Sequence, residues 1–244
     1  MVDAEKIASK QKQISISEFF EKNKHFLGFD TLQRAVITAV KEAVDNSLDA
    51  CEEARILPTI KVEINKLKGD KLELICQDNG PGIPRDSVEH VFGKFLLGSR
   101  FHAIRQTRGQ QGIGITGVVM YSQLTTGSKT HVISKIKSDS SAVHVDLGLD
   151  TRKNKATKSN EIRDVWFEDG EEVVNGLKIK TVMKAKYQRG RQSVHQYLRM
   201  TSIVNPHATI QLTVRDGDGE IIDHGHWIRT TEKLPRVVEE IKPH

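Results

Sequence analysis

The sequence contains no apolar run of the roughly 18 to 20 residues that a helix needs to cross a bilayer. Its residues 1–12 are polar and mixed in charge, without the apolar core of a signal peptide. It has only two cysteines, Cys51 and Cys76, both in segments that we expect to be buried. So few cysteines suit a reducing compartment better than a disulfide framework. The sequence therefore predicts a cytoplasmic location.

Metal-ligand patterns and a strong charge excess are also missing. The ten histidines show no pairing at metal-ligand spacing, which argues against a structural zinc site, and His224-Gly225-His226 is typical of a surface turn. The net charge of +5 gives a pI of about 9.1. An excess this small indicates an ordinary solvated surface, with a weak attraction to nucleic-acid phosphates as the alternative. The basic run 184–191 has the same two interpretations, a solvated helix entry or a DNA contact.

Hydrophobic periodicity predicts the secondary structure. We expect a long helix over 30–55, whose apolar stripe is bordered by Glu42 and Asn46. Strands are expected over 60–66 and 72–77, joined by a hairpin connection at 68–70. Further on we expect helices over 84–97, 115–122 and 192–203, an irregular Gly-rich loop over 98–114, and strands over 131–136, 142–149, 177–184 and 208–215.

This order of elements is not the regular alternation of a doubly wound fold. It predicts an α/β (α+β) two-layer sandwich, in which a mixed and mainly antiparallel sheet carries its helices on one face. The 244 residues are enough for a sizeable core.

Three short segments carry chemistry, and the first is Glu42-Ala43-Val44-Asp45-Asn46 in the long helix. Glu42 and Asn46 lie one turn apart and therefore on the same side. A carboxylate there can deprotonate an attacking water, and a carboxamide oxygen can bind Mg²⁺. Alone, such a pair is more often part of a solvated helix face.

The second segment, Asp78-Asn79-Gly80-Pro81-Gly82, follows a strand. An ionised Asp78 accepts hydrogen bonds and donates none, so it would accept the exocyclic amino group of adenine and repel the keto oxygen of guanine. Gly80 and Gly82 permit unusual backbone angles and a close approach to a flat base. A simple turn is the alternative.

The third segment, Arg108-Gly109-Gln110-Gln111-Gly112-Ile113-Gly114-Ile115, leads into a helix. Exposed backbone N–H groups and a helix N-terminus attract phosphates. The segment lacks the Lys-Ser/Thr ending of a P-loop, and a Gly-rich loop by itself is a weak signal.

In this order, about 30 residues apart, the three segments resemble the GHKL family of Bergerat-fold ATPases. This family includes gyrase-type topoisomerases, heat-shock chaperones, histidine kinases and mismatch-repair ATPases. Within it the sequence is most similar to the B subunits of the type IIB DNA topoisomerases. The similarity runs through residues 15–20, 41–50, 98–100 and 105–114.

The resemblance implies ATP and Mg²⁺ as cofactors, with Glu42 as the catalytic base, Asn46 as the Mg²⁺ ligand and Asp78 as the adenine reader. The implied nucleotide-binding set is Asn46, Asp78, Gly80, Gly82 and a lid of Ser99, Arg100, Arg108, Gly109, Gln110, Gln111, Gly112, Ile113, Gly114 and Ile115. It also implies a strap over 1–20 that reaches a second copy, an ATPase domain over 21–226, and the start of a linker over 227–244. The chain looks cut from a longer protein. Double-stranded DNA, a second B subunit and the DNA-cutting A subunit are the implied partners.

One departure from the family pattern concerns the binding of the adenine base. Many relatives carry a Gly-Thr pair whose threonine helps to bind it, whereas Asn175-Gly176-Leu177-Lys178 stands here, so no threonine ligand is assigned. The family's phosphate-sensing lysine belongs to a downstream domain.

The alternatives to a topoisomerase are a chaperone- or mismatch-repair-like ATPase, a histidine kinase domain and a degenerate binding module. A histidine kinase needs a phosphoacceptor hairpin upstream. The presence of Glu42 and Asn46 disfavours the degenerate binding module.

Overall fold

The structure, a computed structural model, describes residues 16–25, 27–93, 114–150 and 155–236. The helices of this part are α2 (Ile16–Asn23), α3 (Leu32–Glu53), α4 (Arg85–Gly93), α5 (Gly114–Thr126) and α6 (Val194–Val204). The strands are β1 (Thr59–Lys66), β2 (Lys71–Asp78), β3 (Thr130–Lys135), β4 (Ala142–Asp150), β5 (Lys155–Asp164), β6 (Phe167–Glu168), β7 (Glu171–Glu172), β8 (Gly176–Lys184), β9 (Thr209–Arg215) and β10 (Ile221–Trp227).

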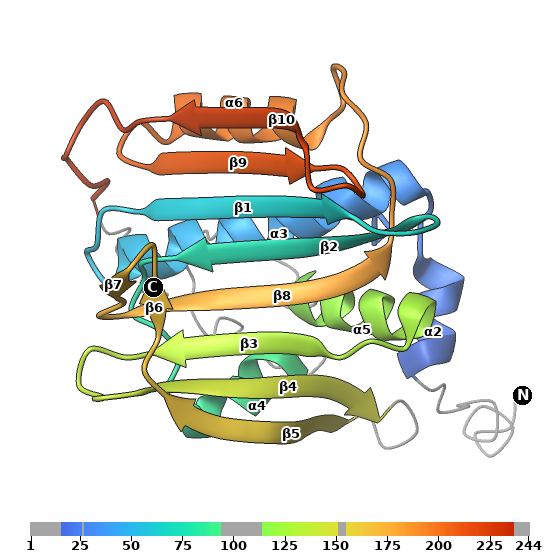
Figure 1. The fold of residues 1–244 in the computed structure, drawn as a ribbon, viewed down its shortest axis with the longest axis horizontal. Helices are drawn as coiled ribbons and strands as arrows, with labels where there is room; N and C mark the ends of the chain where they lie inside the picture. The colour runs from blue at the N-terminus through green and yellow to red at the C-terminus, as the bar shows by residue number, and fades with distance from the viewer. Residues whose placement is uncertain (1–15, 26, 94–113, 151–154, 237–244) are drawn as a thin grey trace, which may run out of the picture.

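Eight strands form one sheet in the order β10-β9-β1-β2-β8-β3-β4-β5, and β6 pairs with β7 in a separate hairpin. Only the β1–β9 pair in the main sheet is parallel. The helices lie on one face of the sheet, and of the elements that the structure describes only the β6–β7 hairpin lies on the opposite face (Figure 1). The predicted fold class, a mixed and mainly antiparallel sheet with helices on one face, is confirmed.

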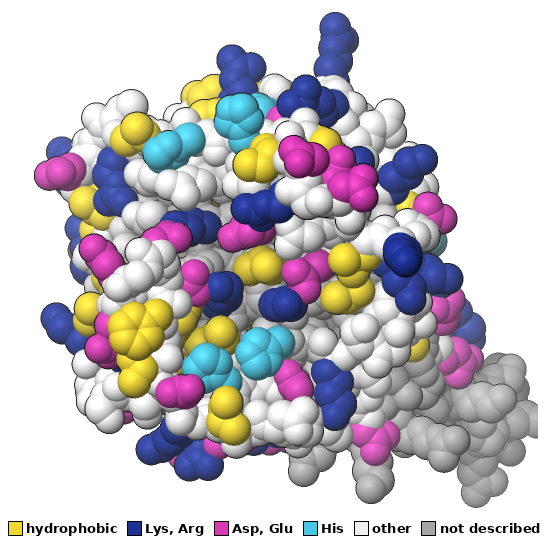
Figure 2. Space-filling view, viewed as in Figure 1, with side chains coloured by type: hydrophobic (Ala, Val, Ile, Leu, Met, Phe, Trp, Pro, Cys, Tyr) yellow, Lys and Arg dark blue, Asp and Glu magenta, His cyan; other side chains and the backbone are white. Residues whose placement is uncertain are grey.

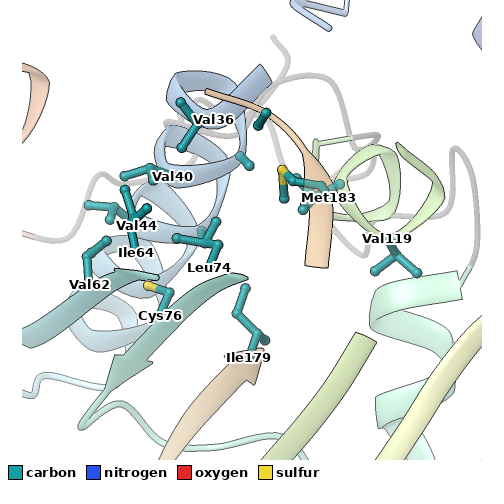
Figure 3. Packing of buried hydrophobic residues seen from close by; sticks show 14 of the residues in the cluster. Val36, Val40, Val44, Val62, Ile64, Leu74, Cys76, Val119, Ile179 and Met183 are labelled. Atoms are coloured by element: carbon teal, nitrogen blue, oxygen red, sulfur yellow. The ribbon is translucent and has the colours of Figure 1, made fainter. Parts of the chain in front are cut away.

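The core lies between α3 and the middle of the sheet, where the two sequence periods meet. The buried residues of α3 recur every three or four positions, and those of β1 and β2 alternate. Valines of the helix pack on aliphatic side chains of the strands, and each fully buried side chain contributes about 1.5 to 3 kcal/mol. Figure 3 shows this layer, made of Val36, Val40, Val44, Val62, Ile64, Leu74, Cys76 and Ile179. Both cysteines are buried and free, as predicted.

Two edge strands were not predicted. Most residues of β5 are polar, as is common at a sheet edge, and they show no apolar alternation. The interpretation of His224-Gly225-His226 as a turn is wrong, since these residues lie in β10 and pair with β9. A Cβ on Gly225 would lie 2.3 Å from the Trp227 ring, so the glycine makes room for that ring.

Helix α2 was not predicted either, and it crosses the proposed boundary between strap and domain at residue 20. The Phe20 ring is fully buried, with its centroid 5.5 Å from that of Phe29 and 6.2 Å from that of Tyr121. Phe20, which lies on the strap side of the proposed boundary, therefore belongs to the core of the domain. Residues 1–15 lie outside the described residues.

The basic run 184–191 follows β8 and leads into α6, and the buried Asp223 anchors it. Arg189 Nη2 donates to Asp223 Oδ1 at 2.7 Å, and the Tyr187 hydroxyl donates to Oδ2. Although burial raises the pKa of Asp223, these two donors and the nearby His195 hold it at about 2. The charge of Arg189 is thus already partnered within the domain.

The segment after β10 has no regular structure, yet it is bound to the domain. Arg229 donates to Pro58 O and to the hydroxyls of Thr59 and Thr209. Arg55 Nη1 donates to Pro235 O at 2.6 Å. Among the described residues, none of the helices combines the length and the apolar character of a membrane span.

Candidate functional site

Asp78 is the centre of the site. It ends β2, and strand alternation turns its side chain to the helix-covered face, where it is 5% exposed. Ser47 Oγ donates to Asp78 Oδ2 at 2.7 Å, and the Gly80 N–H donates to Oδ1 at 2.8 Å. The Leu177 N–H donates to the same carboxylate. These three donors leave part of its acceptor capacity for a ligand.

Burial raises the pKa of Asp78 to about 6, although the hydrogen bonds from Ser47, Gly80 and Leu177 lower it. At neutral pH the group is therefore mostly an ionised carboxylate at low exposure. Such a carboxylate gains from any further donor that reaches it.

Glu42 lies on α3, the helix that also carries Ser47. It faces Gly114, the first residue of α5. A Cβ on Gly114 would lie 1.8 Å from Glu42 Oε2, so glycine leaves the room that this carboxylate occupies. Burial raises the pKa of Glu42, against the opposing effect of Lys41. A half-buried carboxylate with a raised pKa beside a helix N-terminus can accept a proton from water.

Asn46 follows Glu42 by one helical turn and directly precedes Ser47. Helix α3 therefore presents Glu42 toward α5 and Ser47 toward Asp78, with the half-buried Asn46 between them. The contacts in the structure join Glu42 to Gly114, and Asp78 to Ser47 and Gly80. Ile115 follows Gly114 in α5 and packs against the core. Of the other predicted residues, Ser99, Arg100, Arg108, Gly109, Gln110, Gln111, Gly112 and Ile113 lie outside the described residues.

The two glycines of the turn after Asp78 make room for protein groups. A Cβ on Gly80 would lie 2.9 Å from Asp78 Oδ1 and 3.3 Å from Cys51 Sγ. Gly82 has a φ of +72°, and a Cβ there would lie 2.1 Å from Lys135 O. Gly82 therefore allows the turn to pack on the end of β3, a reason that the sequence did not suggest.

Side-chain amides and hydroxyls fix this turn at both ends. Asn79 Oδ1 accepts from Thr59 N at 2.8 Å, and Asn79 Nδ2 donates to Leu57 O at 3.1 Å. Ser134 Oγ accepts from Ile83 N at 2.7 Å and donates to Ile83 O at 2.9 Å. The turn is thus pre-shaped by the protein itself.

Sequence reasoning did not assign a role to Ser47, Asn79 or Ser134. A signal for Ser47 was present, since it lies on the apolar stripe of α3 and a buried hydroxyl requires a hydrogen-bond partner. Asn79 and Ser134 had no such signal, because their partners are distant in the sequence.

Within the described residues no group of three or more His, Cys, Asp or Glu side chains could hold a metal ion. The Asn46 amide oxygen is a possible single protein ligand. Mg²⁺ commonly takes one or two protein oxygens and completes its shell with water and substrate phosphates. The donor set therefore fits a Mg²⁺ ion that is bound together with a phosphate ligand.

The family resemblance implies that a nucleotide binds at Asp78. On that expectation, Ser47→Ala weakens nucleotide binding about three- to tenfold, because the Asp78 carboxylate loses a charge-assisted hydrogen bond. The pKa of Asp78 should also rise, so the loss of affinity at low pH should begin at a higher pH than in the parent. Titration of both proteins with ATP over about pH 5 to 8 measures this. Ser202→Ala on α6 is the matched control. Identical affinities and pH profiles would remove Ser47 from the site.

Comparison with known proteins agrees with this geometry. The model of the family described as histidine kinase-, DNA gyrase B-, and HSP90-like ATPase matches residues 31–152, half of the chain. The B subunit of the type 2 DNA topoisomerase 6 of Methanosarcina acetivorans is 49% identical over 243 residues, 99% of this chain and 37% of that protein. The proteins of the same name from Archaeoglobus fulgidus and Natronomonas pharaonis are each 48% identical, over 98% and 99% of this chain and over 38% and 29% of their own lengths.

The chain thus spans between 29% and 38% of the length of these relatives. Its fold, its matched region and this identity over nearly all its residues lead to one assignment. The chain belongs to the histidine kinase-, DNA gyrase B- and HSP90-like ATPases and, within them, to the family of type 2 DNA topoisomerase 6 B subunits.

Proposed function

We propose that this chain is the ATP-binding and ATP-hydrolysing part of a type II DNA topoisomerase, in the B subunit of topoisomerase VI. The observation that carries the proposal is the buried Asp78 carboxylate, held by Ser47 on the helix that also presents Glu42 and Asn46. The similarity to topoisomerase 6 B subunits over almost the whole chain supports it.

ATP fits the donors and acceptors of this site. The Asp78 carboxylate accepts a hydrogen bond from the adenine amino group. It would repel a guanine keto oxygen in the same position. Asn46 would hold Mg²⁺ together with the phosphates of the nucleotide. The start of α5, with Gly114 and Ile115, receives the phosphates at a helix N-terminus. The family resemblance adds Ser99, Arg100 and residues 108–113 as the lid.

Hydrolysis assigns a chemical role to Glu42. A water molecule attacks the γ-phosphorus, its proton passes to the Glu42 carboxylate, and the bond to the ADP oxygen breaks. The raised pKa of Glu42 brings this base closer to neutral pH, where a general base is most effective. Mg²⁺ supplies charge neutralisation on the phosphates.

In the whole enzyme, ATP binding and hydrolysis would operate a gate for the passage of double-stranded DNA. Two B subunits close on each other when ATP binds, around a DNA segment, and A subunits supply the DNA cleavage. The expected partners are therefore the topoisomerase VI A subunit in a heterotetramer, a second B subunit, and double-stranded DNA, in the cytoplasm.

The experiment combines the complete B subunit with its A subunit, supercoiled DNA and labelled ATP. The proposal predicts Mg²⁺- and ATP-dependent relaxation with release of free phosphate. Label transferred to protein histidine would favour the histidine kinase alternative. No ATP binding and no relaxation would contradict the proposal.

ATP with Mg²⁺, and not ADP, is expected to shift this chain from monomer toward dimer. The reason is a binding free energy that is more favourable for the closed dimer than for the open monomer. Removal of residues 1–15 should abolish the shift. The deletion should end before α2, because removal of residues 1–20 would also remove the buried Phe20 ring from the core.

Sedimentation with a non-hydrolysable ATP analogue measures the shift. Equal melting temperatures of the whole chain and of the chain without residues 1–15 would show that the deletion leaves the fold intact. A monomer at a saturating analogue concentration, with the analogue demonstrably bound, would contradict the proposed role of the first fifteen residues in this chain.

A further inference from the structure

Asn175, the residue before β8, contacts the turn that follows Asp78. Its Nδ2 donates to two successive carbonyl oxygens, that of Asn79 at 3.0 Å and that of Gly80 at 2.7 Å. Both protons of the amide group are thereby used. Asn175 therefore fixes the backbone of this turn without reaching into the site itself.

The backbone after Asn175 allows this close approach. Gly176 has a φ of +154°, and a Cβ there would lie 2.3 Å from Asp78 O. Leu177 pairs with Asp78 across the sheet and donates its N–H to the Asp78 carboxylate. The start of β8 thus supports both the backbone and the side chain of the proposed adenine reader.

The β6–β7 hairpin precedes Asn175 in the chain and is bound to the main sheet. Three ion pairs tie the hairpin to three strands of the main sheet: Lys61–Asp169 from β1, Lys178–Glu168 from β8 and Lys135–Glu172 from β3. The Trp166 indole, 2% exposed, donates to Glu168 at 2.7 Å. The hairpin lies over one end of the open sheet face (Figure 1), where acidic and basic side chains are mixed (Figure 2). The segment that leads to Asn175 is therefore bound to the sheet at three points.

The hydrogen bonds of Asn175 matter because packing supports the turn incompletely. An open groove of about 630 Å³ lies between the hairpin and the ends of β1 and β2, with Gln77, Asn79 and Val174 among its lining residues. On this side the turn borders open space. Loss of the two hydrogen bonds from position 175 should therefore shift the turn, because few packed side chains oppose its movement on this side.

We propose that Asn175 is a positioning residue for nucleotide binding: through the carbonyls of Asn79 and Gly80 it holds the turn beside Asp78 in the shape that receives adenine. The proposal rests on the proposed ATP site. Many GHKL relatives bind the adenine base with the threonine of a Gly-Thr pair, whereas this chain has Gly176-Leu177 and offers no hydroxyl group there. The affinity for adenine therefore depends on how the turn and Asp78 are held.

The test is Asn175→Asp, with Asn175→Ala as a second variant. A carboxylate at this position faces two carbonyl oxygens and can donate to neither, so the ATP and ADP affinities should fall in parallel, roughly tenfold. Alanine should cost about threefold, because water can replace the amide. In the complete B subunit the rate at saturating ATP should stay within about twofold of the parent rate.

Val174→Asp is the matched control, since it adds the same charge at a neighbouring side chain that is 61% exposed. It should leave affinity unchanged. If both Asn175 variants bind ATP like the parent, or if turnover falls while affinity holds, the positioning role is overturned. If the parent chain binds no ATP, or if Asp78→Asn leaves ATP affinity unchanged, the proposed site itself is overturned.

Discussion

Glu42→Ala will abolish ATP hydrolysis and leave ATP binding largely intact. Glu42 acts on the attacking water, so its removal affects the transition state more than the bound ground state. Loss of a general base typically lowers the rate by about 10²- to 10⁴-fold.

The measurement is phosphate release by the complete B subunit, together with equilibrium binding of ATP to both proteins. Glu53→Ala, an exposed glutamate at the end of the same helix, is the matched control and should turn over ATP normally. An alanine variant that hydrolyses ATP at the parental rate would show that Glu42 is not the base.

Asp78→Asn is expected to weaken ATP binding by about 10- to 150-fold, the equivalent of a charged hydrogen bond of roughly 1.5 to 3 kcal/mol. It should also relax discrimination against GTP, because an amide can rotate to donate where a carboxylate cannot. Calorimetric titration with both nucleotides measures the two effects. Asp70→Asn in the β1–β2 connection is the control, and an unchanged ATP affinity for Asp78→Asn would remove this residue from the adenine site.

The same carboxylate predicts a pH dependence. Its pKa of about 6 lies above the value of an unfolded chain, so the nucleotide-free protein loses stability as the pH rises through about 4 to 6. ATP binding favours the ionised form, so ATP affinity should fall as the pH drops through about 6. Asp78→Asn should show a flat profile over this range. A parent profile as flat as that of the variant would contradict the role of the ionised form.

The sequence predicted the interior of the fold better than its edges. Helix α3 and strands β1, β2, β8 and β9 were predicted because each buries one periodic face. The polar edge strand β5 and the glycine-containing β10 carry little of that signal, and the single buried ring of Phe20 did not reveal α2. Long-range topology, such as the parallel β1–β9 pair, is not encoded in local patterns.

The same division applies to the candidate site. Glu42, Asn46 and Asp78 were singled out because the three segments occur together, in an order and spacing that resemble the GHKL family. The residues that hold them in place were not, because hydrogen bonds such as Asn175 to Gly80 join positions 95 residues apart. A sequence pattern specifies which groups can react, and the packed structure specifies what orients them.

The most direct test of the central claim is a calorimetric titration of this chain with ATP and with GTP, each with Mg²⁺, at neutral pH. An ionised, buried Asp78 predicts saturable binding of one ATP per chain and a GTP affinity weaker by roughly tenfold or more. Absence of ATP binding, or equal affinities for the two nucleotides, would contradict the account.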